Sequence, residues 1–244
     1  MNEPNSSRKY LWLLLFIILI CIVGAGIAVT FFKKEKTGPP VLTANFIDAS
    51  KIEKISKFRS CQGHTVVPQN ESESKRNMKH YLVVLPEYTG KQVEVYAPFN
   101  GIVNSIGARP EQGLEGEIWL GVRGSEWAVS FQHLYVLDTL TEGQKIKAGD
   151  LIGHIANKGI DLVYAVGSRE VKMIDGYASP YSAIDSIFSH MTDQVFNEYV
   201  GEHVKTRDDL IWTKAYRDQN PCEYRNTEGG LNDIAHPEDW VVME

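Results

Sequence analysis

Short apolar runs separated by turn residues extend from His80 to Val166, and they constrain the fold more than any other feature. The runs are rich in Val, Ile, Tyr and Trp, and the residues between them include Gly, Pro and Asn, which favour turns. The eight runs are HYLVVL, QVEVYA, GIVNSI, EIWLGV, WAVSFQHL, KIKAGD, LIGHIA and DLVYAV. Short strands at this spacing predict a mainly β domain, a sandwich or a barrel.

The segments on either side of these runs have a different character. Residues 33–57 begin as a polar, proline-containing spacer and are interpreted as a stalk, and the spacing of Ile52, Ile55 and Phe58 allows a short amphipathic helix. The β-domain is expected over 58–170. Beyond it, the run SAIDSIFSHMTDQVFNEYVG carries apolar residues at nearly helical spacing. We therefore predict a helical C-terminal extension over 171–244.

An uncharged apolar run, LWLLLFIILICIVGAGIAVTFF, occupies residues 11–32 after a tail of ten residues. It is long enough to cross a bilayer, which indicates a transmembrane helix. The alternative is a cleaved signal peptide, with Arg8 and Lys9 as its charged region; the run continues beyond its small residues to Phe32, which favours an anchor. Lysines follow the run as well, so the charge pattern leaves the orientation open.

The charge and cysteine content narrow the class of protein. The 244 residues have a formal net charge of -6 and no basic stripe, which argues against nucleic acid as a partner. Cys61 and Cys222 lie near the two ends of the soluble part and would suit a disulfide; two unrelated buried thiols are the alternative. We therefore expect a single-pass membrane protein whose soluble domain is extracytoplasmic. Arg217 and Asp218 are expected to form a local ion pair that pins the tail.

Two segments carry a recognisable skeleton. VEVYAPFNGIVNSIG (93–107) and LTEGQKIKAGDLIGHI (140–155) place Pro and Gly turns between strands, and QHL (132–134) lies between them. With His80 ahead of them, this order resembles the LytM/lysostaphin-type zinc endopeptidases of cell walls over about residues 78–166. The resemblance implies a barrel-sandwich domain, the duplicated hybrid motif.

The zinc ligands of that family are not reproduced here. Its site resembles His-x-x-x-Asp on one strand and His-x-His on a later one, because catalytic zinc needs three protein ligands and an open position. His80 matches the first ligand, but Val84 stands where Asp is expected. Asp161-Leu162-Val163 replaces His-x-His, so the resemblance implies a degenerate member without its usual metal.

Two residues remain candidates for a catalytic role. Asp161 stands at the family's non-ligand catalytic histidine, and His133 matches the position that polarises the substrate carbonyl. Asp161 could instead be a structural carboxylate satisfied by backbone N–H groups or by a nearby Lys. A rebuilt zinc site from His64, His80 and Asp161 is chemically acceptable, although spacing gives it no support.

The polar segment just before the strands is a candidate binding surface. Lys79, His80 and Tyr81 follow one another, and His64 lies upstream in the same polar stretch. Together they could form a ligand-binding floor over the sheet, or a loop tied down by hydrogen bonds.

These observations support one principal hypothesis and two alternatives. The principal hypothesis is a membrane-anchored, extracytoplasmic LytM-like domain without catalytic activity or cofactor, which binds or scaffolds a polymer or protein of the cell envelope. The first alternative is a divergent zinc hydrolase with a rebuilt ligand set that includes His80. The second is a transport-adaptor subunit, but the long helical hairpin typical of adaptors is missing from the sequence.

Overall fold

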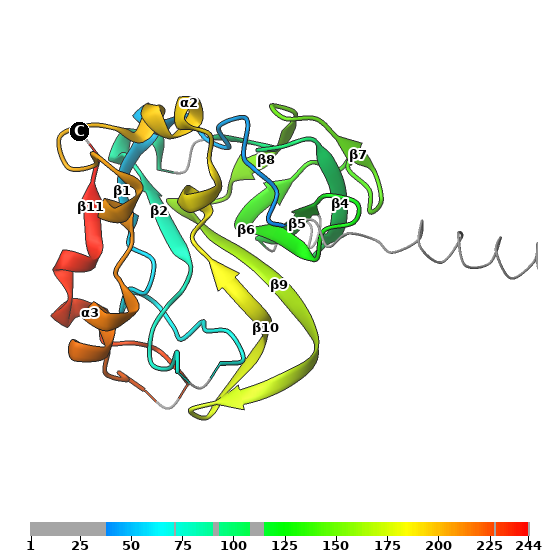
Figure 1. Ribbon diagram of the computed structural model, residues 1–244. Helices are drawn as coiled ribbons and strands as arrows, with labels where there is room; N and C mark the ends of the chain where they lie inside the picture. The colour runs from blue at the N-terminus through cyan, green and yellow to red at the C-terminus, as the bar shows by residue number, and fades with distance from the viewer. Residues whose placement is uncertain (1–37, 71, 90–92, 108–114, 227, 244) are drawn as a thin grey trace, which may run out of the picture. The chain divides into compact units, whose positions relative to one another are not determined.

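Eleven antiparallel strands form one sheet in the computed structural model, which describes residues 38–70, 72–89, 93–107, 115–226 and 228–243 (Figure 1). The main path through the sheet runs β11-β1-β2-β9-β6-β5-β4-β7; β10 pairs with β9, and β8 lies between β6 and β3. In chain order the strands are β1 (Ile52–Ser56), β2 (His80–Val84), β3 (Glu94–Tyr96), β4 (Gly101–Ile106), β5 (Gly116–Gly121), β6 (Trp127–Val136), β7 (Lys145–Ile146), β8 (Leu151–Ile155), β9 (Gly159–Ile174), β10 (Tyr177–Asp185) and β11 (Trp240–Val242).

The predicted mainly β fold is confirmed. Each of the eight apolar runs contributes one strand, and these are β2 to β9 in sequence order. The described residues belong to one compact unit, Thr37–Glu244. Residues 38–57 are therefore part of the domain, and the predicted stalk over 33–57 is wrong for this portion.

The spacing of Ile52, Ile55 and Phe58 allowed a short helix, but Ile52 and Ile55 lie in strand β1, which contains a β-bulge. The pairing of β1 with β2 shifts register between Ile52 and Lys54. A β-bulge of this kind changes the alternation of side chains, so residues three apart can face the same way. Ile52 and Ile55 are both buried in the main core, and their spacing imitates that of a helix.

The predicted helical C-terminal extension over 171–244 is also largely wrong. Residues 171–185 continue the sheet as the end of β9 and as β10, and the α-helices that follow are short. The apolar residues of the predicted helix are buried, among them Ile187, Phe188 and Tyr199. Thr192 caps a new helix by accepting a hydrogen bond from the Val195 amide. Packing against the sheet thus divides the segment into short, separately capped turns.

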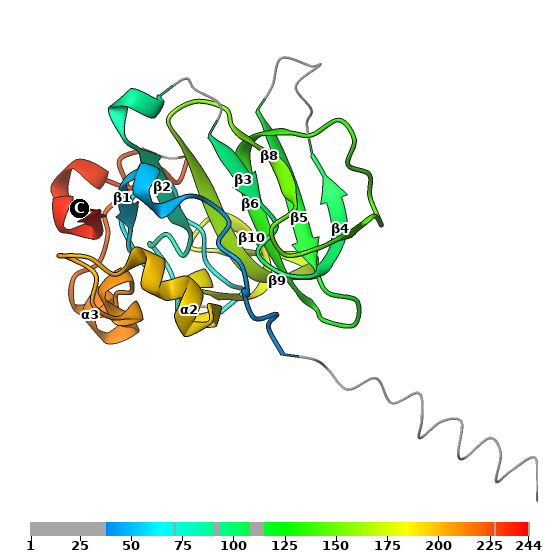
Figure 2. The ribbon, with the colours of Figure 1, turned by 90° about the horizontal axis from the view of Figure 1, so that it is seen from above.

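The helical elements of the described residues are brief. The α-helices are α2 (Asp193–Phe196) and α3 (Lys214–Gln219), and the 3-10 turns are η1 (Ala49–Lys51), η2 (Pro86–Tyr88), η4 (Ile187–His190), η5 (Asn197–Tyr199), η6 (Arg207–Leu210), η7 (Asp233–Ala235) and η8 (Pro237–Asp239). Figure 2 shows this C-terminal part beside β1 and β2, with β3 to β8 on the other side of β9.

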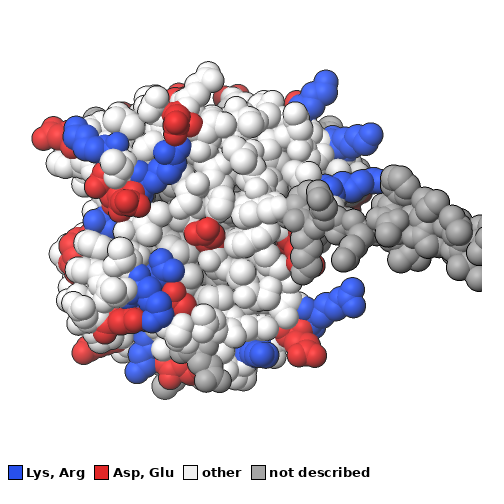
Figure 3. Space-filling view, viewed as in Figure 1, with Lys and Arg blue, Asp and Glu red and all other residues white. Residues whose placement is uncertain are grey.

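The sheet carries apolar clusters on both of its faces. The main core includes Phe46, Leu82, Phe131, Leu162 and Phe188. A second cluster, on the other face of β9, is covered by the segment between β1 and β2 and contains Phe58, Val66, Val67, Met78, Val163, Ala165, Ile174 and Ile184. On the face shown in Figure 3, positive and negative side chains are interspersed, and neither sign forms a broad patch.

Cys61 and Cys222 form the predicted disulfide, with an S–S distance of 2.05 Å. None of the helices in the described part of the chain has the length and apolar character needed to cross a bilayer. The segment predicted to span the membrane, residues 11–32, lies outside the described residues.

Candidate functional site

Cross-strand registers decide which candidate residues share a face of the sheet. Residues directly opposite one another in neighbouring strands point to the same side. One row across the sheet consists of Glu117, Gln132, Asp161 and Tyr81. The neighbouring row consists of Ile118, Phe131, Leu162 and His80, and it faces the main core. His80 and Asp161 therefore lie on opposite faces of the sheet.

His80 is a buried structural residue, which contradicts its proposed metal-binding and surface-binding roles. Its side chain is 1% exposed and packs between the rings of Phe58 and Phe188. Its Nδ1 lies 2.8 Å from the Ser56 carbonyl oxygen, which can only accept, so Nδ1 carries the proton. The other nitrogen, Nε2, accepts from the Ser186 hydroxyl at 2.8 Å. Burial lowers the pKa of His80 to about 4, and neither nitrogen is left for a metal.

Asp161 is held by a lysine. A nearby Lys was one of the structural partners predicted for this carboxylate from the sequence. It is 5% exposed, and its Oδ2 lies 3.4 Å from the Lys79 ammonium nitrogen. Lys79 is equally buried, and its ammonium also donates to the side-chain oxygen of Gln132 at 2.7 Å. Gln132 in turn donates to Glu117 at 3.0 Å. The ammonium group of Lys79 is therefore held by two partners, the carboxylate of Asp161 and the side-chain oxygen of Gln132.

His133 extends this arrangement toward solvent. It occupies the left-handed region of backbone space, with φ at 63°. Its Nε2 lies 3.5 Å from Asp161 Oδ2, and its Nδ1 contacts the carboxylate of Glu115. Asp161, and then Glu115, raise the pKa of His133 to about 9, so its ring is charged at neutral pH. We call the alternating series Glu115, His133, Asp161 and Lys79 the charge chain.

Tyr81 and His64 lie at the edge of the charge chain. Tyr81 shares a row with Asp161, and its hydroxyl is 3.5 Å from Nδ1 of the exposed His64. Burial raises the pKa of the Tyr81 hydroxyl above its usual range, so it stays protonated. Of the four residues predicted as a binding floor, the structure thus brings Lys79, Tyr81 and His64 together and turns His80 away.

Two cavities open on either side of the charge chain, and both are lined by His133 and Asp161. Cavity A has a volume of about 470 Å³ and cavity B about 450 Å³. Cavity A is lined by Lys54, Gln62, Gly63, Tyr81, Leu82, Val83, Glu115, His133, Asn157, Lys158, Gly159, Ile160, Asp161, Asp233 and Trp240. Cavity B is lined by His64, Thr65, Val66, Val67, Lys79, Gln132, His133, Asp161, Ala178, Ser179, Pro180 and Tyr181.

The residues present do not fit the catalytic zinc that the family resemblance implies. Val84 and Val163 stand at two of the expected ligand positions, both are buried in apolar clusters, and neither offers a lone pair. Asp161 is already held by two cationic groups, which a metal ion would have to displace. The rebuilt set of His64, His80 and Asp161 is ruled out as well, because His80 lies on the other face.

A second group of potential ligands is Cys61, His236 and Asp239, whose donor atoms lie within 4.8 Å of one another. Cys61 is engaged in the disulfide and cannot act as a thiolate. Asp239 accepts from Arg217 at 2.5 Å and from the Trp212 indole nitrogen at 2.6 Å. This group is therefore a structural cluster and not a metal centre.

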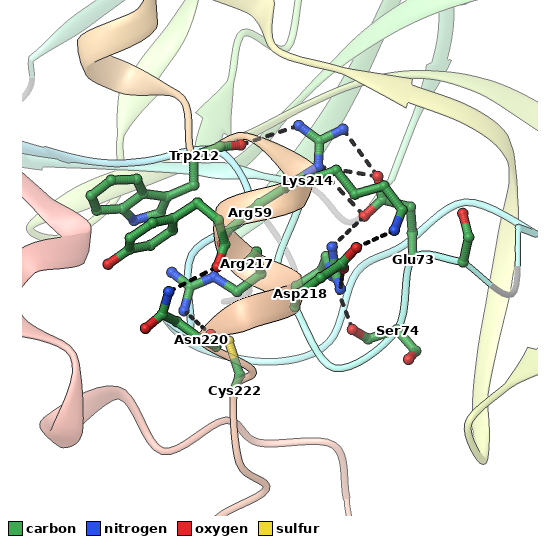
Figure 4. Close-up of polar contacts among 12 residues, drawn as sticks. Arg59, Glu73, Ser74, Trp212, Lys214, Arg217, Asp218, Asn220 and Cys222 are labelled. Atoms are coloured by element: carbon green, nitrogen blue, oxygen red, sulfur yellow. Dashed lines mark hydrogen bonds and ion pairs between the residues drawn. The ribbon is translucent and has the colours of Figure 1, made fainter.

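Buried arginines hold the segment that supplies Lys79 (Figure 4). Arg217 of α3 is fully buried and donates to the Arg59 carbonyl at 2.7 Å and to the Asp239 carboxylate. The predicted pair of Arg217 with Asp218 does not form, because Asp218 instead accepts from Arg76 at 2.7 Å. Arg76 also binds Glu73 of its own segment at 2.7 Å, and its pair with Asp218 ties this segment to α3.

Sequence reasoning missed Glu115, Glu117 and Gln132. Glu117 and Gln132 both lie in predicted strands, but their partnership depends on the register between those strands. A weak signal was present, because each is a polar residue in an otherwise apolar run and therefore marks the side of the strand that faces away from the core.

No protein-family model and no curated protein matches this chain. Similar solved structures include lysostaphin, at 17% identity and a TM-score of 0.32, over 47% of this chain and 50% of lysostaphin. They also include a SpoIIQ–SpoIIIAH pore-forming complex, at 14% identity and a TM-score of 0.36, over 58% of this chain and 88% of that one. A zinc-containing peptidase from Vibrio cholerae matches at 14% identity and a TM-score of 0.35, over 52% of this chain and 37% of the peptidase. This chain thus spans half the length of lysostaphin and less than half the length of the peptidase. Likeness as distant as this assigns no activity to the chain.

Proposed function

We propose that this protein is a membrane-anchored, extracytoplasmic LytM-like domain that binds a component of the cell envelope and does not hydrolyse it. The observation that carries the proposal is the charge chain. Lys79 and His133 hold Asp161 at the place where the resemblance expects the catalytic histidine of a zinc site.

The charge chain argues against metal-dependent hydrolysis. A catalytic zinc ion requires neutral or anionic donors that converge on one point. Here an ammonium group lies 3.4 Å from the central carboxylate, and the adjacent imidazole is protonated at neutral pH. The positive charge that zinc would supply is thus provided by two side chains, which cannot activate a water molecule as a metal does.

The same groups are suited to binding. Cavities A and B give a ligand access to the charge chain from both sides, and their walls carry charges of both signs. Lys54 and Lys158 line cavity A together with the carboxylates of Glu115 and Asp233. A peptide with both amino and carboxyl groups, such as a cell-wall peptide, would find a partner for each.

The location rests on two independent features. The apolar run over 11–32 is long enough for an anchor, and the disulfide between Cys61 and Cys222 is of a kind that persists in oxidising compartments. Both support a domain held at the outer side of a membrane.

The proposal is tested with the full chain purified in detergent. After incubation with zinc and gel filtration, elemental analysis should find much less than one zinc per chain. Stoichiometric zinc that is lost in Asp161→Asn would contradict the proposal and favour the divergent hydrolase.

Binding is tested by co-sedimentation with purified peptidoglycan. The wild type should sediment, and His133→Ala and Asp161→Asn should reduce the bound fraction severalfold. Lys172→Gln is the matched control, because Lys172 is exposed on β9 and lines none of the cavities. Equal binding by all variants would show that the charge chain is not the binding site.

A further inference from the structure

A third cavity, cavity C, lies farther along the same face of the sheet. Its volume is about 940 Å³, and its lining residues are Asn104, Ser105, Glu117, Trp119, Glu126, Ala128, Gln132, Val166, Gly167, Ser168, Arg169, Pro180, Tyr181 and Ser182. It shares Gln132, Pro180 and Tyr181 with cavity B. We infer that cavity C is a carbohydrate-binding subsite built around the indole of Trp119, an inference that rests on the proposed envelope-binding function.

Trp119 stands among small side chains. Its direct cross-strand partners are Ser105 on β4 and Ser130 on β6. Further along the same face, Gly121 is opposite Ala128, which is in turn opposite Ala165. Large aromatic residues in sheets are normally covered by their cross-strand neighbours. These neighbours are too small to do so, and the indole stays partly exposed at the floor of the cavity.

A β-bulge directs an amide group toward the same place. Val103 is opposite Leu120 and Ser105 is opposite Trp119, so Asn104 is an extra residue in β4. Bulges of this kind re-aim a side chain out of the regular alternation. The Asn104 amide lies directly over Gly121, where an added Cβ would come within 2.5 Å of its nitrogen. Glycine at position 121 therefore makes room for the amide beside the indole.

The rim of cavity C supplies further hydrogen-bonding groups. Tyr181 of β10 packs against Trp119 with ring centroids 6.1 Å apart. Burial and the Glu117 carboxylate raise the pKa of Tyr181 to about 12, so its hydroxyl stays protonated. Within the described parts of the chain, the side chains of Asn104 and Arg169 make no hydrogen bond, and both are exposed on the cavity wall. They are available to a ligand.

This combination matches the chemistry of a sugar ring. A pyranose has an apolar C–H face, which stacks on an aromatic ring, and a rim of hydroxyl groups that both donate and accept hydrogen bonds. A partly exposed indole that lines the same cavity as an amide, a guanidinium group and carboxylates presents the complementary surface. The cavity lies within the size range of small-molecule sites, which leaves room for an oligosaccharide.

The test is calorimetric titration of the full chain in detergent with the β-1,4-linked tetrasaccharide of N-acetylglucosamine. Wild type should bind, Trp119→Ala should weaken the affinity at least tenfold, and Trp119→Phe should retain most of it. Asn104→Ala should weaken it severalfold. Tyr135→Ala is the matched control, because Tyr135 is an aromatic residue that is 41% exposed and lines no part of cavity C.

The possible outcomes separate this inference from the proposed function. Peptidoglycan binding without tetrasaccharide binding would overturn the carbohydrate subsite and leave the proposed function intact. Failure to bind either ligand would overturn both. If Trp119→Ala does not fold, as judged by its circular dichroism spectrum, Asn104→Ala decides. Because Asn104 is exposed, its replacement should not impair folding. Unchanged affinity of Asn104→Ala for the tetrasaccharide would overturn the inference.

Discussion

Acidification should destabilise this protein through His80. The ordinary pKa of histidine is about 6.5, and burial lowers that of His80 to about 4. Between these two values the unfolded chain binds a proton that the folded chain excludes, so stability falls as the pH drops from about 6.5 to about 4. Each pKa unit corresponds to 1.36 kcal/mol, which gives a loss of about 3 kcal/mol from this residue.

The assay is urea unfolding of the full chain, followed by circular dichroism at pH 7.5 and pH 4.0. Wild type is compared with His80→Gln, which preserves hydrogen-bonding groups but cannot become charged. Other groups titrate in both proteins and cancel in the comparison. The pH-dependent change in the free energy of unfolding should be smaller in His80→Gln by about 3 kcal/mol.

One control variant accompanies the comparison. His154→Gln replaces a partly exposed histidine on β8 and shows what the loss of an imidazole does outside the core. An identical pH dependence in wild type and His80→Gln would refute the reasoning from burial. Zinc that stabilises wild type but not His80→Gln would instead restore His80 as a metal ligand.

Three further predictions concern the disulfide, the charge chain and the buried arginine. The disulfide closes a loop with a sequence separation of 161, so Cys61→Ala with Cys222→Ala should lower the free energy of unfolding by about 5 kcal/mol by the chain-entropy estimate; an unchanged urea midpoint would contradict this. In Asp161→Asn the pKa of His133, followed by NMR, should fall from about 9 toward 6.5. The stabilisation by protonated His133 is accordingly full below about pH 6.5 and is lost as the pH rises through about 9. If the pKa of His133 does not move in Asp161→Asn, Asp161 is not the main cause of the raised pKa. Arg217→Met should cost about 3–5 kcal/mol, because it leaves the buried Asp239 without its cation, and a loss below 1 kcal/mol in thermal or urea unfolding would show that the pair is dispensable.

The sequence predicted the strands because their signal is local. Each of β2 to β9 contains or overlaps one of the short apolar runs bounded by turn residues, and no long-range information is needed to find that run. The conformation of the C-terminal apolar residues, which were predicted from their spacing to be helical, depends instead on the sheet against which they pack. Ile184 shows this, because it pairs with Ala165 as part of β10 although its spacing fits a helix.

The candidate site was predicted less well because it depends on register. A shift of one residue moves every side chain of a strand to the other face. The motif placed His80 at the ligand position, whereas the pairing of His80 with Leu162 turns it into the core. Lys79, one residue earlier, reaches Asp161 instead. Sequence alone offered a lysine as one partner for Asp161 but could not choose among the lysines of the chain.

The pairing of β11 with β1 has a consequence for how the chain is made. Trp240 lies opposite Ser56, and Val242 lies opposite Lys54, so this edge of β1 stays open until residues 240–242 have been synthesised. Cys61 must likewise wait for Cys222. During synthesis, the growing chain therefore carries an unpaired strand edge and a free thiol, both of which are liable to wrong partners. We expect protection of this nascent form by chaperones to raise its yield.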